Sequence, residues 1–341
     1  MNRQQQLTRR RILTLGAMGT GGLLLAACGV GTSQPAETAA AMPEKEVESA
    51  FAPVTIENCG VSTTYEQPPQ RAVAMAQHAT EVMLTLGLQD HMVGTAYLED
   101  PILPDLADAY QQIPVLSELY PSREVFLGVE PDFLYAGWVS AFRDEVAGPR
   151  EALLELNINS YVAQANCLER KATIEDVFVD FLSIGKIFGV PERAEAYVAG
   201  IRERLAEVHT KTQPADPKVT VFVFDSDNEA PYTAAGTGIV NALLEEAGGI
   251  NIFADVEGDF ATVNWESVIE RNPDVIVLHD ATWSTADEKR EFLVNSEALA
   301  SIKAIQDQRY VVVPFTATQP GPRSIDVIET LFKGFYPAQA G

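Results

Sequence analysis

Residues 122–136 have the sequence SREVFLGVEPDFLYA, and 142 residues further along the chain residues 264–278 have the sequence NWESVIERNPDVIVL. Both stretches begin with a helix-capping residue, since the side-chain oxygen of Ser122 or Asn264 can accept a hydrogen bond from a free backbone N–H of the first turn. Both then reach Pro-Asp and an uninterrupted apolar run. The proline ends the helix, and the apolar run predicts a strand buried in a parallel sheet.

The elements around these two stretches repeat in the same order. Before each stretch we predict a strand, a helix stopped by a glycine and a second strand; after each stretch we predict a short helix and a strand. The expected elements are 71–76, 80–86, 92–96, 151–156 and 158–162 in the first set, and 219–224, 239–247, 250–253, 297–305 and 310–313 in the second. Strands that alternate with helices indicate a mainly parallel, helix-covered sheet. The sequence therefore predicts an α/β fold of two similar lobes, related by internal duplication, with a ligand cleft between them.

A single long helix is expected to join the lobes. It starts at Pro191, and its apolar residues share one face: Ala194, Tyr197, Val198, Ile201, Leu205 and Val208. About 18 helical residues span roughly 27 Å, which suits a stiff connector better than a flexible hinge, so we expect small closure motions. The predicted organisation is an N-terminal α/β lobe (54–190), a connector helix (191–213) and a C-terminal α/β lobe (214–341).

The N-terminus has the pattern of an export signal. Three arginines at 9–11 precede an apolar run that is too short and too rich in glycine to span a membrane, which needs about 20 apolar residues. The run ends in LAAC at 25–28, which resembles the bacterial lipobox, so we expect a signal peptide at 1–27 and lipidation of Cys28. The arginines also resemble a twin-arginine export signal, with an ordinary Sec signal as the alternative. Residues 28–53 lack a periodic apolar face and are predicted to be a lipid-anchored flexible tether.

Composition restricts the partners and the redox state of the cysteines. The 341 residues carry a formal charge of −24, and because residues 1–27 hold four arginines and no acid, the remaining 314 residues carry −28. Such an acidic body repels nucleic acid, so no nucleic-acid partner is expected. Outside the cytoplasm the environment is oxidising, so Cys59 and Cys167 can form a disulfide; two free buried thiols are the alternative.

The ligand site is expected in the cleft, because ligands of open α/β sheets bind beyond the carboxyl ends of the strands. Several residues that follow predicted strands have broad aromatic faces that suit a flat or bulky organic ligand. Arg323, a cation in an acidic chain, can pair with an anionic group of a ligand, or can form a structural ion pair instead. The candidate ligand-binding residues are Gln77, His78, Tyr97, Trp138, Asp225, Tyr232, Trp283 and Arg323. Rim or core packing is the alternative role for the aromatic residues.

Motifs for catalysis or metal binding are weak. No two of the four histidines have HExxH or similar spacing. His78 and His279 are both expected at strand ends of opposing lobes, where they could hold a transition metal or haem. No Ser–His–Asp or Cys–His arrangement can be assembled, so we expect no enzyme and no cofactor. A metal-ion binder of similar shape and an extracytoplasmic α/β enzyme are the rival interpretations.

A lipobox, an acidic tether, two α/β lobes and one connecting helix resemble a substrate-binding lipoprotein of an ABC importer, in particular the iron-siderophore and cobalamin binding family. The resemblance covers about residues 54–337. It rests on PQRAV at 69–73, LGLQDHMVG at 86–94 and the two stretches ending in Pro-Asp. It implies that Glu124 and Glu266 dock into arginine sockets on the permease; a favourable interaction with the helix dipole is the alternative role.

The resemblance also implies the ligand and the partners. YAGW at 135–138, NC at 166–167 and PFTA at 314–317 are similar to a subgroup associated with cobalamin or deazaflavin-precursor uptake, whereas general family members carry ferric siderophores or haem. The implied function is to capture an iron-siderophore or cobalamin-like ligand outside the membrane and deliver it to an ABC permease with its ATPase. We expect a monomer that is held at the cell membrane by its lipid anchor.

Overall fold

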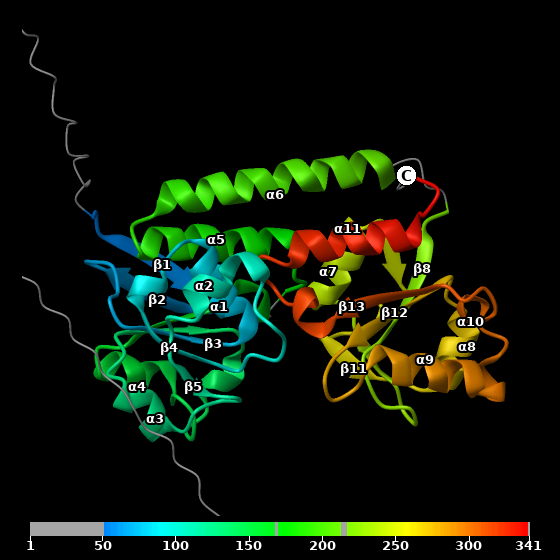
Figure 1. Ribbon diagram of the computed structural model, residues 1–341, viewed down its shortest axis with the longest axis horizontal. Helices are drawn as coiled ribbons and strands as arrows, with labels where there is room; N and C mark the ends of the chain where they lie inside the picture. Colours follow the sequence, from blue (N-terminus) through cyan, green and yellow to red (C-terminus); the bar gives the residue numbers. More distant parts are fainter. Residues whose placement is uncertain (1–50, 168–169, 213–216, 340–341) are drawn as a thin grey trace, which may run out of the picture. The chain divides into compact units, whose positions relative to one another are not determined.

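Two parallel sheets carry the fold in the computed structural model, which describes residues 51–167, 170–212 and 217–339 (Figure 1). The first sheet contains β3 (Ala72–Met75), β4 (Met92–Ala96), β5 (Val115–Ser117), β6 (Phe133–Ala136) and β7 (Asn159–Val162). The second contains β8 (Val219–Phe224), β10 (Gly249–Asn251), β12 (Val275–Asp280) and β13 (Tyr310–Pro314). The predicted signal peptide, Cys28 and most of the predicted tether lie outside the described residues.

The strand order repeats between the sheets. The first sheet has the order β5-β4-β3-β6-β7 and the second β10-β8-β12-β13, and all neighbouring strands in both are parallel. Without β5, each sheet therefore places its first strand between the second and the third. This confirms the predicted α/β fold with mainly parallel sheets.

The helices that open the two quoted stretches begin where the caps predict. The Ser122 hydroxyl accepts a hydrogen bond from Val125 N–H at the start of α3 (Arg123–Gly128). The Asn264 side chain accepts one from Ser267 N–H at the start of α8 (Trp265–Arg271). In each case one free backbone donor of the first turn is satisfied, which fixes the helix start.

The Pro-Asp pairs have a structural role that the two lobes share. Asp132 follows α3, and its carboxylate accepts hydrogen bonds from the backbone N–H groups of Gln70 and Arg71 at 2.7 and 2.9 Å. Asp274 follows α8, and its carboxylate accepts one from the backbone N–H of Thr220 at 3.0 Å. Each aspartate thus joins the start of the third strand of its lobe to the start of the first strand.

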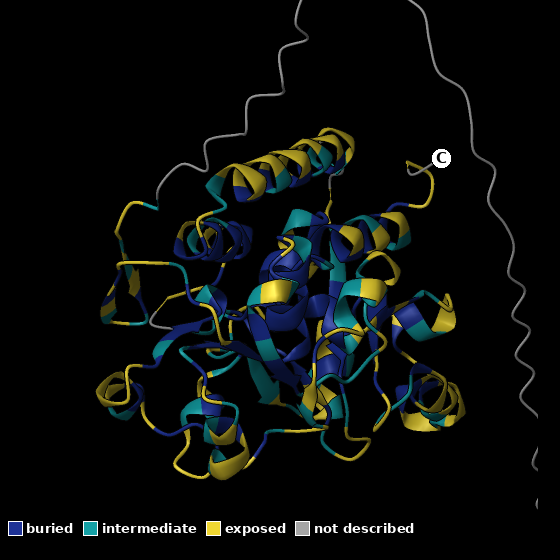
Figure 2. Cartoon of the chain, turned by 60° about the vertical axis from the view of Figure 1, so that its left-hand side comes forward, coloured by how far each residue is buried: buried dark blue, intermediate teal, exposed yellow. Residues whose placement is uncertain are grey.

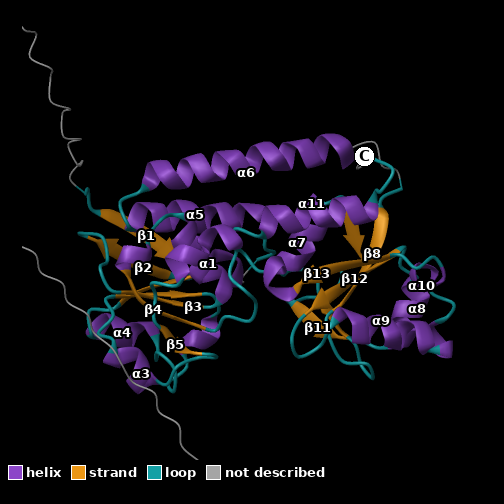
Figure 3. Cartoon of the chain, in the orientation of Figure 1, coloured by secondary structure: helices purple, strands orange, loops and turns teal. Residues whose placement is uncertain are grey.

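Helices cover both sheets, and their outer faces are exposed while the central strands β3, β6, β8 and β12 are mostly buried (Figures 2 and 3). Glycine ends α1 (Gln77–Thr85) and α7 (Ile239–Glu246), because Gly87 and Gly248 adopt φ values of +67° and +83° just after these helices. The remaining helices are α2 (Ala107–Tyr110), α4 (Arg150–Glu155), α5 (Ile174–Ile187), α6 (Pro191–Thr212), α9 (Ala286–Asn295), α10 (Lys303–Gln306) and α11 (Ser324–Phe335). Two antiparallel strand pairs complete the fold: the hairpin of β1 (Val54–Asn58) with β2 (Val61–Tyr65), and β9 (Tyr232–Ala234) with β11 (Phe260–Thr262).

The long helix α6 packs on both α5 and α11, which belong to different lobes (Figure 1). It starts at Pro191 as expected, and five residues of the predicted stripe are buried: Ala194, Val198, Ile201, Leu205 and Val208. The largest apolar cluster extends under these helices from β3 and β6 to β8 and β13. The two lobes therefore share a continuous core along the connector.

Among the described residues, none of the helices combines the length and the apolar character needed to cross a bilayer.

Candidate functional site

A cavity of about 420 Å³ lies between the lobes, and residues on both sides line it. We call it the interlobe cavity. From the first lobe, Tyr97 and Glu99 follow β4 and Trp138 follows β6; from the second, Asp225 follows β8 and Phe315 follows β13. All five lie just beyond the carboxyl ends of parallel strands, where open α/β sheets bind ligands. The volume falls in the usual range of small-molecule sites.

Aromatic side chains are the largest group among the residues that line the interlobe cavity. On the first lobe, the Tyr97 ring lies 4.7 Å from the Tyr120 ring and 5.4 Å from the Trp138 ring. On the second lobe, Tyr232 stacks on Phe260 at 5.2 Å and Trp283 meets Phe315 edge-on at 5.3 Å. Trp283 is 53% exposed and Tyr232 is 38% exposed, so both present open faces to an incoming ligand.

Three carboxylates also line the cavity: Glu99, Asp225 and Asp259. Burial raises the pKa of Glu99 to about 7, and the nearby charges of Asp100 and Asp225 act in the same direction. Burial also raises the pKa of Asp259. One oxygen of each of these two carboxyl groups, Oε2 of Glu99 and Oδ1 of Asp259, is buried without a hydrogen-bond partner among the described residues.

Asp225 differs because its charge is compensated. Its Oδ1 lies 2.8 Å from Nδ1 of His279, and its Oδ2 accepts a hydrogen bond from the Ser226 hydroxyl. Burial acts to raise the pKa of Asp225, but these hydrogen bonds and the nearby Lys289 charge outweigh it and hold the pKa below its usual value. The other ring nitrogen of His279 has no partner among the described residues, and Phe260 and Phe315 pack against the ring.

Five of the eight predicted ligand-binding residues line the cavity: Tyr97, Trp138, Asp225, Tyr232 and Trp283. The other three, Gln77, His78 and Arg323, do not. Gln77 and His78 were expected in a loop after a strand, but α1 begins at Gln77 and both residues are 1% exposed. His78 instead packs edge-on against Trp138, with ring centroids 5.0 Å apart, and so supports one wall of the cavity from behind.

Arg323 joins the two lobes instead of facing the cavity. Its guanidinium donates to both carboxylate oxygens of Glu81 in α1, at 2.8 and 2.6 Å, and to the backbone carbonyl of Pro101 at 2.7 Å. The two side chains are 13% and 1% exposed. Of the two roles expected for Arg323, the structure thus shows the structural ion pair, since Glu81 already occupies the bidentate donor face.

Gln77 connects this ion pair to the cavity. Its amide nitrogen donates to Glu81 at 3.1 Å, and its amide oxygen accepts from the backbone N–H groups of Glu99 and Asp100 at 3.1 and 3.3 Å. A buried amide with both ends satisfied fixes its partners in place. Gln77 therefore positions the loop that carries Glu99, although it does not line the cavity.

Glu124 and Glu266 occupy the same place in the two lobes. Each lies in the first turn of its helix, two residues after the capping side chain, and each is exposed. Neither carboxylate forms a hydrogen bond or ion pair with another described residue. The permease-docking role implied by the resemblance remains a prediction.

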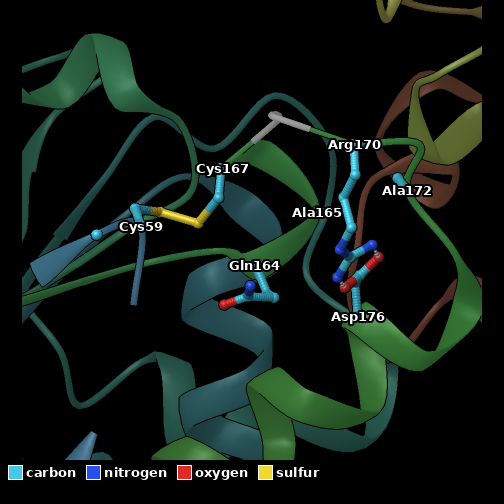
Figure 4. A pocket seen from close by; sticks show the side chains of 8 residues that line it. Cys59, Gln164, Ala165, Cys167, Arg170, Ala172 and Asp176 are labelled. Atoms are coloured by element: carbon cyan, nitrogen blue, oxygen red, sulfur yellow. Dashed lines mark hydrogen bonds and ion pairs between the residues drawn. A yellow bond between two sulfur atoms is a disulfide. The ribbon is translucent and has the colours of Figure 1, made fainter. Parts of the chain in front are cut away.

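A second cavity, of about 510 Å³, lies beside the disulfide that joins Cys59 to Cys167 (Figure 4). Arg170 and Asp176, which form an ion pair, line it together with Gln164. Although this cavity is larger, its lining residues all come from the first lobe, and its one cation is already paired. We therefore take the interlobe cavity as the candidate site.

The described residues contain no group of three or more His, Cys, Asp and Glu side chains arranged to hold a metal ion. His78 packs on Trp138 and His279 pairs with Asp225, so each histidine of the proposed metal pair is engaged within its own lobe.

Sequence reasoning missed Glu99, Tyr120, Asp259 and Phe260. Tyr120 and Asp259 lie in loops away from the expected strand ends, but Glu99 follows Tyr97 by two residues and could have been found.

Comparison with known proteins agrees with this architecture. The sequence profile of the family described as periplasmic binding protein matches residues 73–317. The chain belongs to the periplasmic binding protein family. The family predicted from the sequence is therefore confirmed.

Three similar proteins span most of this periplasmic binding protein. "Uncharacterized ABC transporter substrate-binding lipoprotein YvrC" of Bacillus subtilis is 26% identical over 92% of this chain and 94% of its own length. The vitamin B12-binding protein of Vibrio cholerae is 24% identical over 77% of this chain and 87% of its own. The crystal structure of an ABC-type Fe3+-hydroxamate transport system from Saccharomonospora viridis is 26% identical, with a TM-score of 0.70, over 83% of this chain and 99% of that one.

Proposed function

We propose that this periplasmic binding protein captures a metal chelate, either a ferric siderophore or a cobalamin-like corrinoid, in the interlobe cavity and delivers it to an ABC permease with its ATPase. The single observation that carries the proposal is the cavity itself, since aromatic walls from both lobes meet beyond the carboxyl ends of two parallel sheets. The names of the similar proteins support a transport role with a ligand of this class.

The chain acts by binding, without catalysing a reaction. Aromatic residues are the largest group in the cavity walls, and one His–Asp pair, His279 with Asp225, lies near them. The Ser226 hydroxyl bonds to the Asp225 carboxylate and not to the imidazole, so these three described residues do not form a Ser–His–Asp relay. A monomer anchored outside the cytoplasmic membrane through lipidated Cys28 fits the lipobox, the tether and the name of the lipoprotein relative.

Tryptophan fluorescence tests the ligand site, because Trp138 and Trp283 line the cavity whereas Trp265 packs on Phe224 in the second lobe. Titration with ferrioxamine B, aquacobalamin and cyanocobalamin should quench the emission of the wild-type protein at micromolar concentration. In a Trp138→Phe, Trp283→Phe variant the remaining Trp265 emission should be quenched only weakly, and it serves as the internal control. If none of the three compounds binds to the wild-type protein, the proposed ligand class is wrong.

Docking requires a separate test, since Glu124 and Glu266 lie outside the cavity. Replacing both by lysine should leave ligand affinity unchanged and lower uptake into cells by on the order of a hundredfold, about tenfold for each lost charge pair with the permease. The matched control replaces Glu151 and Glu297, one exposed first-turn glutamate in each lobe, by lysine. If both double variants transport equally well, the docking role is excluded.

A further inference from the structure

The charged side chains that line the interlobe cavity all carry the same sign. Of the fifteen described residues that line it, seven are aromatic, three are acidic and none is lysine, arginine or histidine. Anionic chelates and carboxylate-bearing tetrapyrroles need cationic partners when their charges leave water. The cavity therefore lacks what an anionic ligand requires.

Two cations beside the cavity walls, Arg143 and Lys289, are already engaged. Arg143 lies over the Tyr120 ring, 5.7 Å from its centroid, and pairs with Glu145 at 3.1 Å. Lys289 is 2% exposed and donates to the backbone carbonyls of His279 and Ser284 behind the cavity. Neither is among the residues that line it.

Two of the three carboxylates each have an oxygen atom that can accept a further hydrogen bond. Asp225 is compensated by His279, but Glu99 and Asp259 each keep one buried oxygen without a partner. Such an orphaned acceptor costs free energy in the unliganded protein, and a ligand that supplies a positive charge or an N–H donor removes this cost.

The one helix end in the wall does not favour anions either. The cavity reaches Ile239 and Val240, the first residues of α7, whose N-terminus carries a partial positive charge. Asp259 packs against Gly238, the N-cap of this helix, so closely that a Cβ atom at Gly238 would lie 2.9 Å from its Oδ1. A carboxylate of the chain therefore already lies beside this helix end.

We infer that the interlobe cavity selects ligands that carry a positive charge, such as a cationic hydroxamate chelate or a cationic corrinoid, through Glu99, Asp259 and the surrounding aromatic faces. This inference rests on the proposed function and names its ligand class. The aromatic rings contribute because a cation over the face of Trp or Tyr is attracted by the ring quadrupole.

The test compares ligands that share a scaffold and differ in charge. The hydroxamate series is ferrioxamine B, its N-acetyl derivative and its N-succinyl derivative, with net charges of about +1, 0 and −1 at neutral pH. The corrinoid series is aquacobalamin, cyanocobalamin and a monocarboxylate of cyanocobalamin, with the same order of charge. Dissociation constants are measured by tryptophan fluorescence with the full chain in detergent micelles, at low and at high salt.

In any series that binds, affinity should fall about tenfold from cation to neutral ligand and again from neutral ligand to anion, and the differences should shrink at high salt. Glu99→Gln and Asp259→Asn should each reduce the preference for the cation severalfold. The matched control is Glu257→Gln, because Glu257 is exposed, two residues from Asp259 and outside the cavity; its preference should equal that of the wild type.

The pH dependence gives a second readout with a definite sign. Because the pKa of Glu99 is about 7, raising the pH through 7 ionises it, so affinity for ferrioxamine B should rise and affinity for its N-succinyl derivative should fall. The charged and titratable groups that face Glu99 or its tyrosine neighbours are Asp100, Asp225, Tyr97, Tyr120 and Arg143. Glu99→Gln should remove the change around pH 7.

The outcomes separate this inference from the proposed function. Binding in either series without the predicted charge order, or with the anion bound best, overturns the charge selectivity and leaves the chelate function standing. Absence of binding in both series overturns the chelate function, and the charge selectivity that rests on it falls with it.

Discussion

His78 is a neutral imidazole enclosed at the junction of the lobes. It is 1% exposed, and neither ring nitrogen has a hydrogen-bond partner among the described residues. Burial lowers the pKa of His78 to about 4, although the backbone of Gly137 acts in the opposite direction. The residue is therefore uncharged at neutral pH and works as a packing element behind Trp138.

This environment predicts acid sensitivity. In the unfolded chain the imidazole takes up a proton near pH 6.5, whereas in the folded chain it does so only near pH 4, so the unfolded state binds more protons between these values. Stability should consequently fall as the pH drops from 6.5 to 4, by up to about 3 kcal/mol from this residue. Urea unfolding at pH 7 and pH 4.5 measures the loss.

A His78→Leu variant should lose this part of the pH dependence, because leucine has no proton to bind. His91→Gln serves as the control, since His91 is only partly buried and its Nδ1 lies 2.7 Å from the carbonyl oxygen of Pro69. An unchanged stability difference between the two pH values in His78→Leu would show that another group is responsible.

The positions of single residues could be predicted where they follow from local sequence. Tyr97, Trp138, Tyr232 and Trp283 follow or begin strands near the edge where ligands bind, and all four line the cavity. The contacts of Arg323 and Gln77 could not be predicted, because both side chains bond to Glu81, which is distant from Arg323 in the sequence. Only the tertiary structure reveals such a partner.

At the scale of elements, an ion pair joins the two lobes. Glu81 belongs to α1 in the first lobe, and Arg323 is the N-cap residue at the start of α11 in the second. The pair is bidentate and Glu81 is fully buried. Because Gln77 bonds to the same carboxylate and to the Glu99 loop, the pair also holds one side of the interlobe cavity. Breaking it should affect both stability and the site.

Glu81→Gln should destabilise the protein by about 3–5 kcal/mol, because Arg323 is left as a mostly buried charge without its counter-ion. The Glu81→Met, Arg323→Met double variant should be markedly more stable than Glu81→Gln, since it removes both charges. Thermal and urea unfolding measure these differences. Equal stability of the single and double variants would contradict the assignment of a coupled pair.

The repeated elements could be predicted from sequence because the residues that specify each element lie within or next to that element in the chain. The caps Ser122 and Asn264, the Pro-Asp pairs and the apolar runs specify α3, β6, α8 and β12 without reference to the rest of the chain. By contrast, several elements were not predicted: α2, α5, α9, α11, the strands β1 and β2, and the three short strands β5, β9 and β11. α9 is mostly polar, and the three strands are only three residues long, so neither produces a clear hydrophobic period.

At the scale of the molecule between Ala50 and Gly341, the lobes are connected in more ways than the sequence indicated. α6 packs on helices of both lobes, and its Arg204 bonds to Asp326 and Glu329 of α11 at 2.6 and 2.8 Å. The Glu81–Arg323 pair joins the lobes a second time, and a backbone hydrogen bond from Ala172 to Thr237 joins them a third time. A large hinge rotation would have to break these contacts together.

We therefore expect ligand binding to change the overall dimensions very little. Small-angle X-ray scattering of the wild-type protein with and without saturating ferrioxamine B or aquacobalamin should give superimposable curves. A variant with Arg204→Gly and Leu205→Gly, which loosens the middle of α6 and removes a buried side chain, should become measurably more compact when the same ligand binds, because the connector then bends. Marked compaction of the wild-type protein would contradict the stiff connector, since it would require α6 to slide or bend against α5 and α11 within the native core.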